Sequence, residues 1–342
     1  MYKILIIQTA FIGDAVLTLP LIQKLKELYN DAEIDVLSIS STEEIFNASP
    51  FVNKVFVIDK KNKHKGLFSL YKFVQKLKKK NYSKVYSPHR SYRSAIITKL
   101  LSVKESFSFS NSKFKFFYIN IIPYDKNKHE VQRNLDLITY KYDDESWRML
   151  PVVKFKENSK NKVEDFFVNL KSNIKFAAVA PGSIWNTKKY PEKHFVEVIK
   201  LLKEDSYTVF LIGGKDDENL CNSIKNKSGE KVISVAGKYT LIESIELLKR
   251  MDILIANDSA PTHLGVCANI PVLTIYCSTV PEFGFYPYNK KSSYISYNNL
   301  QCKPCGMHGL KECPIKSFDC GNLIEPQHII MKIKEMLNDR NS

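Results

Sequence analysis

The chain of 342 residues is too long for one small core, and two domains of roughly 150–170 residues are expected. Its hydrophobic content of 44% is ordinary for a globular protein, while 51 lysines and arginines against 36 aspartates and glutamates give a net charge of +15. Such a balance favours an acidic partner: nucleic acid, an anionic membrane surface or a phosphorylated substrate. The densest basic clusters, 60–65 and 76–84, are interpreted as solvated faces.

The sequence also predicts a cytoplasmic location. No apolar run approaches ~18 residues, so no transmembrane helix is expected. The N-terminus enters a strand directly, without the regions of a signal peptide. In a reducing compartment, the seven cysteines are not expected to form a disulfide framework.

Strand and helix patterns alternate along the first half. The apolar run 3–8 predicts a buried strand, and helical spacing follows over 15–29. Pro20 predicts a kink in that helix or a start near Leu19. Alternation of this kind predicts a parallel sheet with crossover helices. Further strands are expected at 33–39, 54–59 and 84–88, and a further helix is expected at 67–79.

The turn after the first strand holds one glycine, Gly13, followed by Asp14. A dinucleotide-binding turn would carry G-x-G-x-x-G, and a carboxylate here would repel a phosphate. Asp14 is therefore either the N-cap of the helix or a group with a chemical task. Because a helix N-terminus lowers the pKa of a carboxyl group, Asp14 is expected to be ionised.

The alternation fades over 142–161, which is interpreted as the approach to a linker, and then returns. Two doubly wound α/β domains are therefore predicted, with no internal repeat. The strands expected in the second half are 175–182, 207–214, 231–237, 252–258 and 271–277, and the helices are 241–251, 259–269 and 326–337.

Small and polar residues follow the strand that ends at Asn257. Asp258, Ser259 and Ala260 form the turn, and His263 falls on the first turn of a helix whose amides favour an anion. An N-cap aspartate and a surface histidine would explain the same pattern.

A second polar loop, 180–191, carries Ser183, Thr187, Lys188 and Lys189, which could clamp a diphosphate. A solvated loop with ordinary lysines explains this pattern equally well. The motif G-x-x-x-x-G-K-[ST] is absent, which argues against a P-loop NTPase.

Five stretches occur in the order of a known family: IIQTAFIGDAVLTLPLIQKLK, HEVQRNLDLI, APGSIWNTKKYPEKHF, LIGGKDDE and NDSAPTHLGVCA. Over 1–325 the chain resembles the bacterial ADP-heptose:lipopolysaccharide heptosyltransferases of glycosyltransferase family 9, most of all the heptosyltransferase II branch. The resemblance implies a GT-B fold, in which two Rossmann-like domains face each other across a cleft. Residues 1–165 would bind the acceptor and 173–325 the nucleotide sugar, and 326–342 would form a helix that packs back on the N-terminal domain.

The resemblance also implies roles for single residues. Asp14 would be the catalytic general base, Tyr239 would stack on the adenine, and Asp217 or Glu218 would reach the ribose. Ala260 stands where the family usually has glycine, and it would be strained if the turn needed a positive φ. The implied donor site comprises Ser183, Thr187, Lys188, Asp217, Tyr239, Asp258, Ser259, Ala260 and His263.

The implied acceptor site comprises His89, Arg90, Arg93, His129 and Arg133. In the family this domain binds a phosphorylated, lipid-linked oligosaccharide, and arginine suits bidentate phosphate contact. The net charge suits peripheral contact with the anionic inner face of the inner membrane. Alternatively, Arg90 and Arg93 form helix caps or local ion pairs within the protein and do not bind phosphate. No recognition helix or aromatic motif predicts nucleic-acid binding.

Four cysteines lie close together near the C-terminus: Cys302, Cys305, Cys313 and Cys320. Their spacing is compatible with a structural zinc or iron site, and a related group that glycosylates autotransporters uses a four-cysteine iron site. A loop of free thiols is favoured, because the spacing does not form two C-x-x-C pairs.

The leading hypothesis is an inverting glycosyltransferase that moves heptose from ADP-L-glycero-D-manno-heptose to a lipopolysaccharide inner core. No catalytic cofactor is expected, because Lys188, His263 and helix amides would neutralise the diphosphate. One alternative keeps the fold but uses another nucleotide sugar or a protein acceptor. Another is a non-catalytic basic module that binds a membrane or polyanion, against which the intact Asp14, Lys188 and Asp258 argue.

Overall fold

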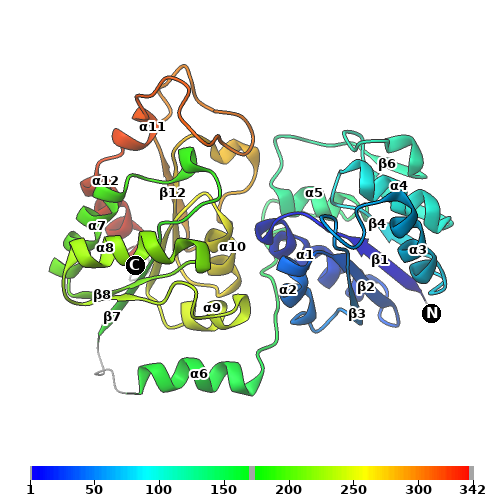
Figure 1. The fold of residues 1–342 in the computed structure, drawn as a ribbon, viewed down its shortest axis with the longest axis horizontal. Coiled ribbons are helices and arrows are strands. Elements are labelled where there is room, and N and C mark those ends of the chain that lie inside the picture. Colours follow the sequence, from blue (N-terminus) through cyan, green and yellow to red (C-terminus); the bar gives the residue numbers. More distant parts are fainter. Residues whose placement is uncertain (1, 169–173, 339–342) are drawn as a thin grey trace. The chain divides into compact units, whose positions relative to one another are not determined.

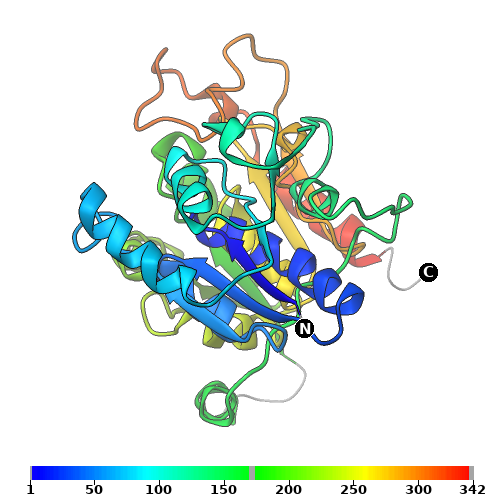
Figure 2. The same cartoon turned by 90° about the vertical axis from the view of Figure 1, so that its right-hand side faces the viewer.

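The computed structural model describes residues 2–168 and 174–338, and the chain divides into two compact units, 1–154 and 155–342 (Figure 1). Figure 2 shows the same ribbon turned by 90°. Each unit has its own parallel sheet with helices, as predicted. The predicted domain start at residue 173 and the last predicted residues, 339–342, lie outside the described residues.

The first unit is built on a six-stranded sheet of order β3-β2-β1-β4-β5-β6, with all strands parallel. Apolar runs form such strands because both faces of a parallel sheet are buried. The strands are β1 (Lys3–Ile7), β2 (Glu33–Ser38), β3 (Lys54–Val57), β4 (Lys84–Tyr86), β5 (Glu105–Phe109) and β6 (Asn120–Ile122). The sequence patterns did not predict β5 and β6, which carry polar residues among few apolar ones.

Helices cover this sheet in two groups. α1 packs against α2 and α5, whereas α3 packs against α4. Right-handed crossovers place helices on opposite faces when the direction of strand addition reverses. The helical segments are α1 (Ile12–Leu28), η1 (Ser40–Thr42), α2 (Glu43–Asn47), α3 (Leu67–Lys78), α4 (Tyr92–Leu101), η2 (Lys115–Phe117) and α5 (Glu130–Asp136).

The first helix, α1, begins at Ile12 and not near Leu19, and it runs without a break through Pro20. An interior proline costs a helix ~3 kcal/mol or more. Residues 15–23 are all buried, and this core packing offsets the loss. Asp14 is thereby fixed in the first turn of α1, just beyond the carboxyl end of β1.

The second unit repeats the arrangement with the order β12-β11-β10-β7-β8-β9, again all parallel. The five predicted strands are confirmed at shorter lengths, and β12 is an additional one. The strands are β7 (Lys175–Ala180), β8 (Tyr207–Leu211), β9 (Val232–Ser234), β10 (Ile253–Asn257), β11 (Val272–Tyr276) and β12 (Ser293–Ser296).

The helices of the second unit include one, α6, in the region that the sequence assigned to a linker. It packs against α9, so residues 155–165 belong to the second unit, whereas the sequence placed them in the first domain. Across residues 2–168 and 174–338, no helix is long and apolar enough to cross a membrane. The helical segments are α6 (Glu157–Phe167), η3 (Asn186–Lys188), α7 (Glu192–Glu204), η4 (Lys215–Asp217), α8 (Glu218–Ser228), α9 (Leu241–Leu248), α10 (Ala260–Cys267), η5 (Pro281–Phe283), α11 (Asp319–Asn322) and α12 (Pro326–Asn338).

The last helix, α12, contributes to the core of the second unit. Its apolar residues Ile329, Ile330, Ile333 and Met336 are buried in the core of the second unit, and the helix packs against α7. That the helix packs back on the N-terminal domain stays a prediction. An amphipathic pattern shows which helix face is buried, but not which partner covers it.

Candidate functional site

The strand order reverses once in each sheet, between β1 and β4 in the first unit and between β7 and β10 in the second. Ligands of doubly wound folds bind beyond the carboxyl ends of the strands at such a reversal. Asp14 follows β1 and His89 follows β4, while the loop with Lys188 follows β7 and Asp258 follows β10. The predicted site residues therefore form two groups, one at each reversal.

Asp14 is the third residue of α1 and not its N-cap, which is Phe11. Its Oδ2 atom accepts a hydrogen bond from the backbone N–H of Phe11 at 3.2 Å. The side chain thus closes the first turn of the helix from the N3 position, and the residue remains partly exposed.

Burial, and then the negative charge of Glu130, raise the pKa of Asp14 to about 7. The Phe11 N–H and the charge of Arg90 oppose this shift. The prediction that Asp14 is firmly ionised was wrong, because desolvation outweighs the helix N-terminus. A carboxyl group of this pKa can accept and release a proton at neutral pH, as a general base must.

His89 lies in a cluster of hydroxyl groups. Its Nδ1 atom is 2.8 Å from Thr9 Oγ1 and 3.1 Å from Ser94 Oγ. Burial, together with the charges of Lys60 and Arg90, lowers the pKa of His89 to about 4. The imidazole is therefore neutral at pH 7 and can form hydrogen bonds but carries no charge.

Three cationic side chains, Arg90, Arg93 and Lys60, belong to the same group as His89. Arg90 lies over the ring of Tyr124, with 4.4 Å between the guanidinium carbon and the ring centroid. Arg93 donates one hydrogen bond to the His64 carbonyl at 2.6 Å, and Lys60 donates to the Thr9 carbonyl at 2.5 Å. Burial, then the charge of Arg93, lowers the pKa of Lys60 to about 8.

His129 and Arg133 are buried, which corrects the expectation that they contact an acceptor. His129 is the N-cap of α5, and its Nδ1 accepts from the Val131 N–H at 3.2 Å. Arg133 donates to Glu130 Oε2 at 2.9 Å and also to two backbone carbonyls. Both side chains therefore fix the start of α5 and the position of Glu130, whose charge adds to the effect of burial on the pKa of Asp14.

In the second unit, Lys188 Nζ and Asp258 Oδ2 form an ion pair at 2.5 Å. The hydroxyl of Thr279 donates to the same carboxylate oxygen at 2.7 Å. Both charged side chains retain a little exposed surface. The pair brings together the two predicted loops that follow β7 and β10.

His263 is buried in the first turn of α10, so the surface alternative is wrong. Within the described residues its Nδ1 atom has no hydrogen-bond partner. Burial lowers the pKa of His263 to about 4; the charge of Asp258 opposes this shift and that of Lys188 adds to it. A neutral imidazole with an unused nitrogen thus lies close to the ion pair.

The turn before α10 is not strained. Ser259, not Asp258, is the N-cap, and Ala260 is the first helical residue, so no positive φ is needed there. Ser259 Oγ donates to the Gly182 carbonyl at 3.4 Å. Asn257 also links the two loops, because its side-chain amide donates to the Pro181 carbonyl at 2.8 Å.

Thr187 is buried, and its hydroxyl is used within the protein. It accepts from the Leu310 N–H at 2.8 Å and from the Ser278 hydroxyl at 2.9 Å. The Thr187 N–H donates to the Leu310 carbonyl at 3.1 Å. The expectation that this hydroxyl is free for a diphosphate is therefore corrected, while Ser183 in the same loop is only half-buried.

The side chain of Asp217 lies against the two loops that follow β7 and β8. Its Oδ2 accepts from the Gly214 N–H at 2.9 Å, and a Cβ atom on Gly182 would overlap its carboxylate. Tyr239 is half-buried, with Lys162 Nζ 4.9 Å from its ring centroid.

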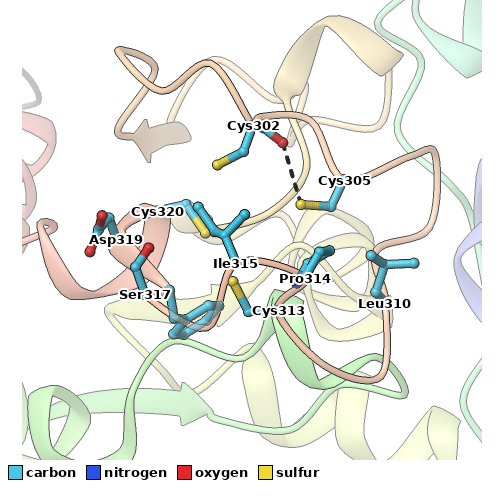
Figure 3. Close-up of a pocket in the computed structure, with 10 residues that line it drawn as sticks. Cys302, Cys305, Leu310, Cys313, Pro314, Ile315, Ser317, Asp319 and Cys320 are labelled. Atoms are coloured by element: carbon cyan, nitrogen blue, oxygen red, sulfur yellow. Dashed lines mark hydrogen bonds between the residues drawn. The ribbon is translucent and has the colours of Figure 1, made fainter.

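The four cysteines near the C-terminus line one cavity of about 230 Å³ (Figure 3). Burial raises the pKa of Cys305 and raises that of Cys320 to about 11. Four thiols have the chemistry of a zinc or iron site. Within the described part of the chain, however, no three histidine, cysteine, aspartate or glutamate side chains are grouped so that they could hold an ion.

Sequence reasoning missed four residues of these groups: Lys60, Glu130, Asn257 and Thr279. Lys60 and Thr279 come within three residues of the ends of β3 and β11. The rule that polar residues just after parallel strands share one edge would have found both. Lys60 was hidden in the basic cluster 60–65.

A family model described as glycosyltransferase family 9 (heptosyltransferase) matches residues 70–315. The chain is 23% identical to lipooligosaccharide heptosyltransferase 2 of Campylobacter jejuni, over 98% of this chain and 99% of that protein. It is 27% identical, over the same shares, to lipopolysaccharide heptosyltransferase 1 of Campylobacter coli.

Solved structures show the same architecture. ADP-heptose lipopolysaccharide heptosyltransferase II of E. coli superposes with a TM-score of 0.78 at 21% identity, over 99% of this chain and 100% of that one. A family 9 glycosyltransferase of Veillonella parvula gives 0.83 at 19% identity, over 99% and 97%. An iron-containing dodecameric glycosyltransferase of enterotoxigenic E. coli gives 0.63 at 16% identity, over 99% and 76%. The GT-B type of fold, two Rossmann-like domains, is confirmed.

Proposed function

We propose that this chain, which belongs to glycosyltransferase family 9, transfers heptose from ADP-L-glycero-D-manno-heptose to a lipopolysaccharide inner-core acceptor, with inversion at the anomeric carbon. The observation that carries the proposal is the ion pair of Lys188 and Asp258 beside the unused nitrogen of His263. Supporting it, an E. coli heptosyltransferase of the same fold has been solved with ADP and with ADP-2-deoxy-2-fluoro heptose.

The second unit would bind the donor. Lys188 would turn from Asp258 to the diphosphate, and His263 and the first amides of α10 would donate hydrogen bonds to phosphate oxygens. Asp258 would then be free for the sugar hydroxyls, and Tyr239 would stack on the adenine. These groups neutralise the leaving diphosphate, so the transfer needs no metal cofactor.

The first unit would bind the acceptor. The acceptor hydroxyl oxygen attacks the anomeric carbon, its proton passes to the Asp14 carboxylate, and the bond from the anomeric carbon to the phosphate oxygen breaks. ADP leaves with that electron pair. Lys60, Arg90 and Arg93 would hold phosphate groups of the acceptor core, with His89 as a neutral hydrogen-bonding partner.

The proposal is tested with purified protein, a panel of ADP, GDP and UDP, and a transfer assay with ADP-heptose and a lipid-A-linked acceptor. ADP is expected to raise the melting temperature more than GDP or UDP. A preference for GDP or UDP would indicate another nucleotide sugar. No response to any nucleotide, with no transfer, would favour a non-catalytic module.

The loop with the cysteines is predicted to position Lys188. Gly309 has a φ of +79°, and a Cβ atom there would lie 2.9 Å from Lys188 Cγ and 3.0 Å from Thr187 Oγ1. Gly309→Ala is therefore expected to weaken ADP binding by roughly three- to tenfold, as a displaced charged hydrogen bond does. Isothermal titration with ADP measures this.

Gly306 provides a matched control, because its φ is +75° and a Cβ atom there would meet nothing within 4 Å. Both alanines lose ~1–2 kcal/mol to left-handed backbone strain. Gly306→Ala should therefore lower the melting temperature similarly but keep the affinity for ADP. Equal ADP affinities of the two variants would contradict a positioning role for Gly309.

We further propose that the four cysteines are free thiols that pack around their cavity. Purified protein is then expected to contain well under one zinc or iron per chain by elemental analysis, and EDTA should leave transfer unchanged. About one metal per chain, lost in Cys302→Ser but kept in Cys221→Ser, would overturn this prediction.

A further inference from the structure

The net charge of the chain lies in one segment. Residues 60–124 contain sixteen lysines and arginines and a single acidic residue, Glu105. The rest of the chain therefore carries 35 basic and 35 acidic residues and is neutral. The carboxylate of Glu105 forms an ion pair with Lys84 Nζ at 2.7 Å. The charge of +15 is thus a local property of the first unit and not a general one.

This segment contributes β4, β5 and β6 to the first sheet, and its helices α3, α4 and η2 pack in sequence beside it. α3 packs against α4, and α4 packs against η2. Figure 1 labels β6, α4 and α3 one after another on the same side of the first unit. Its exposed lysines are Lys61, Lys63, Lys65, Lys72, Lys76, Lys78, Lys79, Lys80, Lys99, Lys104, Lys113 and Lys115. We call the outer surface of α3, α4 and η2, with the residues just before α3 and around η2, the basic face.

Large apolar side chains stand exposed among these lysines. Leu67 and Phe68 are 78% and 71% exposed at the start of α3, and Phe116 is 71% exposed in η2. The rings of Phe114 and Phe116 lie 5.9 Å apart, and Lys72 Nζ lies 4.5 Å from the Phe68 centroid. Exposed apolar side chains gathered among lysines fit a partner that is apolar as well as acidic.

We infer that the basic face docks on an anionic lipid bilayer, with Leu67, Phe68 and Phe116 entering the headgroup region and the lysines over the lipid phosphates. Aromatic and aliphatic side chains flanked by lysine are the combination that binds such surfaces. A nucleic acid or a phosphorylated oligosaccharide would satisfy the lysines but leave the exposed Leu67 and Phe116 in water. The inference rests on the proposed function in one respect only, namely that the acceptor of the transfer is itself located at a membrane.

Flotation with vesicles tests it, using phosphatidylcholine alone and phosphatidylcholine with phosphatidylglycerol at about 3:1, at low and high salt. The protein should float with the anionic vesicles only, and less at high salt. Lys72→Glu/Lys115→Glu should weaken binding by about tenfold or more, and Phe68→Ser/Phe116→Ser by several-fold. Exposed residues of the second unit supply the controls Lys193→Glu/Lys225→Glu and Met331→Ser/Leu323→Ser, which should bind as the wild type does.

Equal binding to both kinds of vesicle, no binding to either, or unchanged binding of the basic-face variants would overturn the inference. Tight binding to duplex DNA without vesicle binding would do the same. The assay contains neither donor nor acceptor, so its result is independent of the proposed transfer. Conversely, the four basic-face substitutions should leave transfer to a lipid-free acceptor fragment unchanged, and a protein that floats but transfers no heptose would refute only the proposed function.

Discussion

Asp14→Asn is expected to reduce sugar transfer by roughly 10²-fold or more, with the affinity for ADP unchanged. Asparagine keeps an oxygen that can accept the Phe11 N–H, so the first turn of α1 stays closed. It replaces the basic carboxylate by a neutral amide, which cannot take the proton of the acceptor hydroxyl. Single-turnover transfer and ADP titration, beside the exposed control Asp31→Asn, measure the effect.

The pH dependence of transfer gives a second readout of Asp14. A base is active when deprotonated, so the rate should rise with pH through about 7, the pKa to which burial and Glu130 raise this group. Arg90→Gln removes a charge that lowers this pKa, so the midpoint should move to higher pH. A rate independent of pH between 5.5 and about 8.5 would contradict the role of base.

The stability of the fold depends on the protonation of the same group. The pKa of Asp14 in the folded chain lies above its ordinary value of 3.8. The protonated form therefore favours folding below that value, and this contribution is lost as the pH rises through about 7. Asp14→Asn should consequently melt no lower than the wild type at pH 8. Near wild-type transfer by this variant would leave Asp14 as a helix cap only, and the base would have to be sought at His89.

Lys188→Ala is expected to weaken ADP binding by roughly 10- to 100-fold and to slow transfer, since a charge-assisted hydrogen bond to the leaving diphosphate is lost. The fold should persist, because the lysine lies in a loop and keeps some exposed surface. Isothermal titration with ADP and steady-state transfer rates measure the two effects separately.

Lys189 is the matched control for this experiment, because it is the neighbouring lysine of the same loop and is also half-buried. Lys189→Ala should change ADP affinity by less than about threefold, as expected of a surface charge. If both variants bind ADP as the wild type does, the loop is an ordinary solvated one and the donor site lies elsewhere.

The sequence by itself determined the two α/β domains and placed Asp14, Lys188 and Asp258 in the segments that follow strands. Both results depend on local properties. Hydrophobic periodicity reveals strands and helices, and a polar residue that directly follows a buried strand falls at the carboxyl edge of a parallel sheet. The order of motifs also sufficed to indicate the family.

Only the tertiary structure decided how each of these side chains is used. Thr187, His129 and Arg133 had the right chemistry for ligands. However, Thr187 is buried and bonded to Leu310, which is distant in the sequence, and the other two are buried and bonded at the start of α5. The pKa of Asp14 depends on Glu130, which lies far away in the sequence. Likewise, α12 found its partner in the second unit. Burial and Coulomb interactions act through space, so a pattern along the chain cannot fix them.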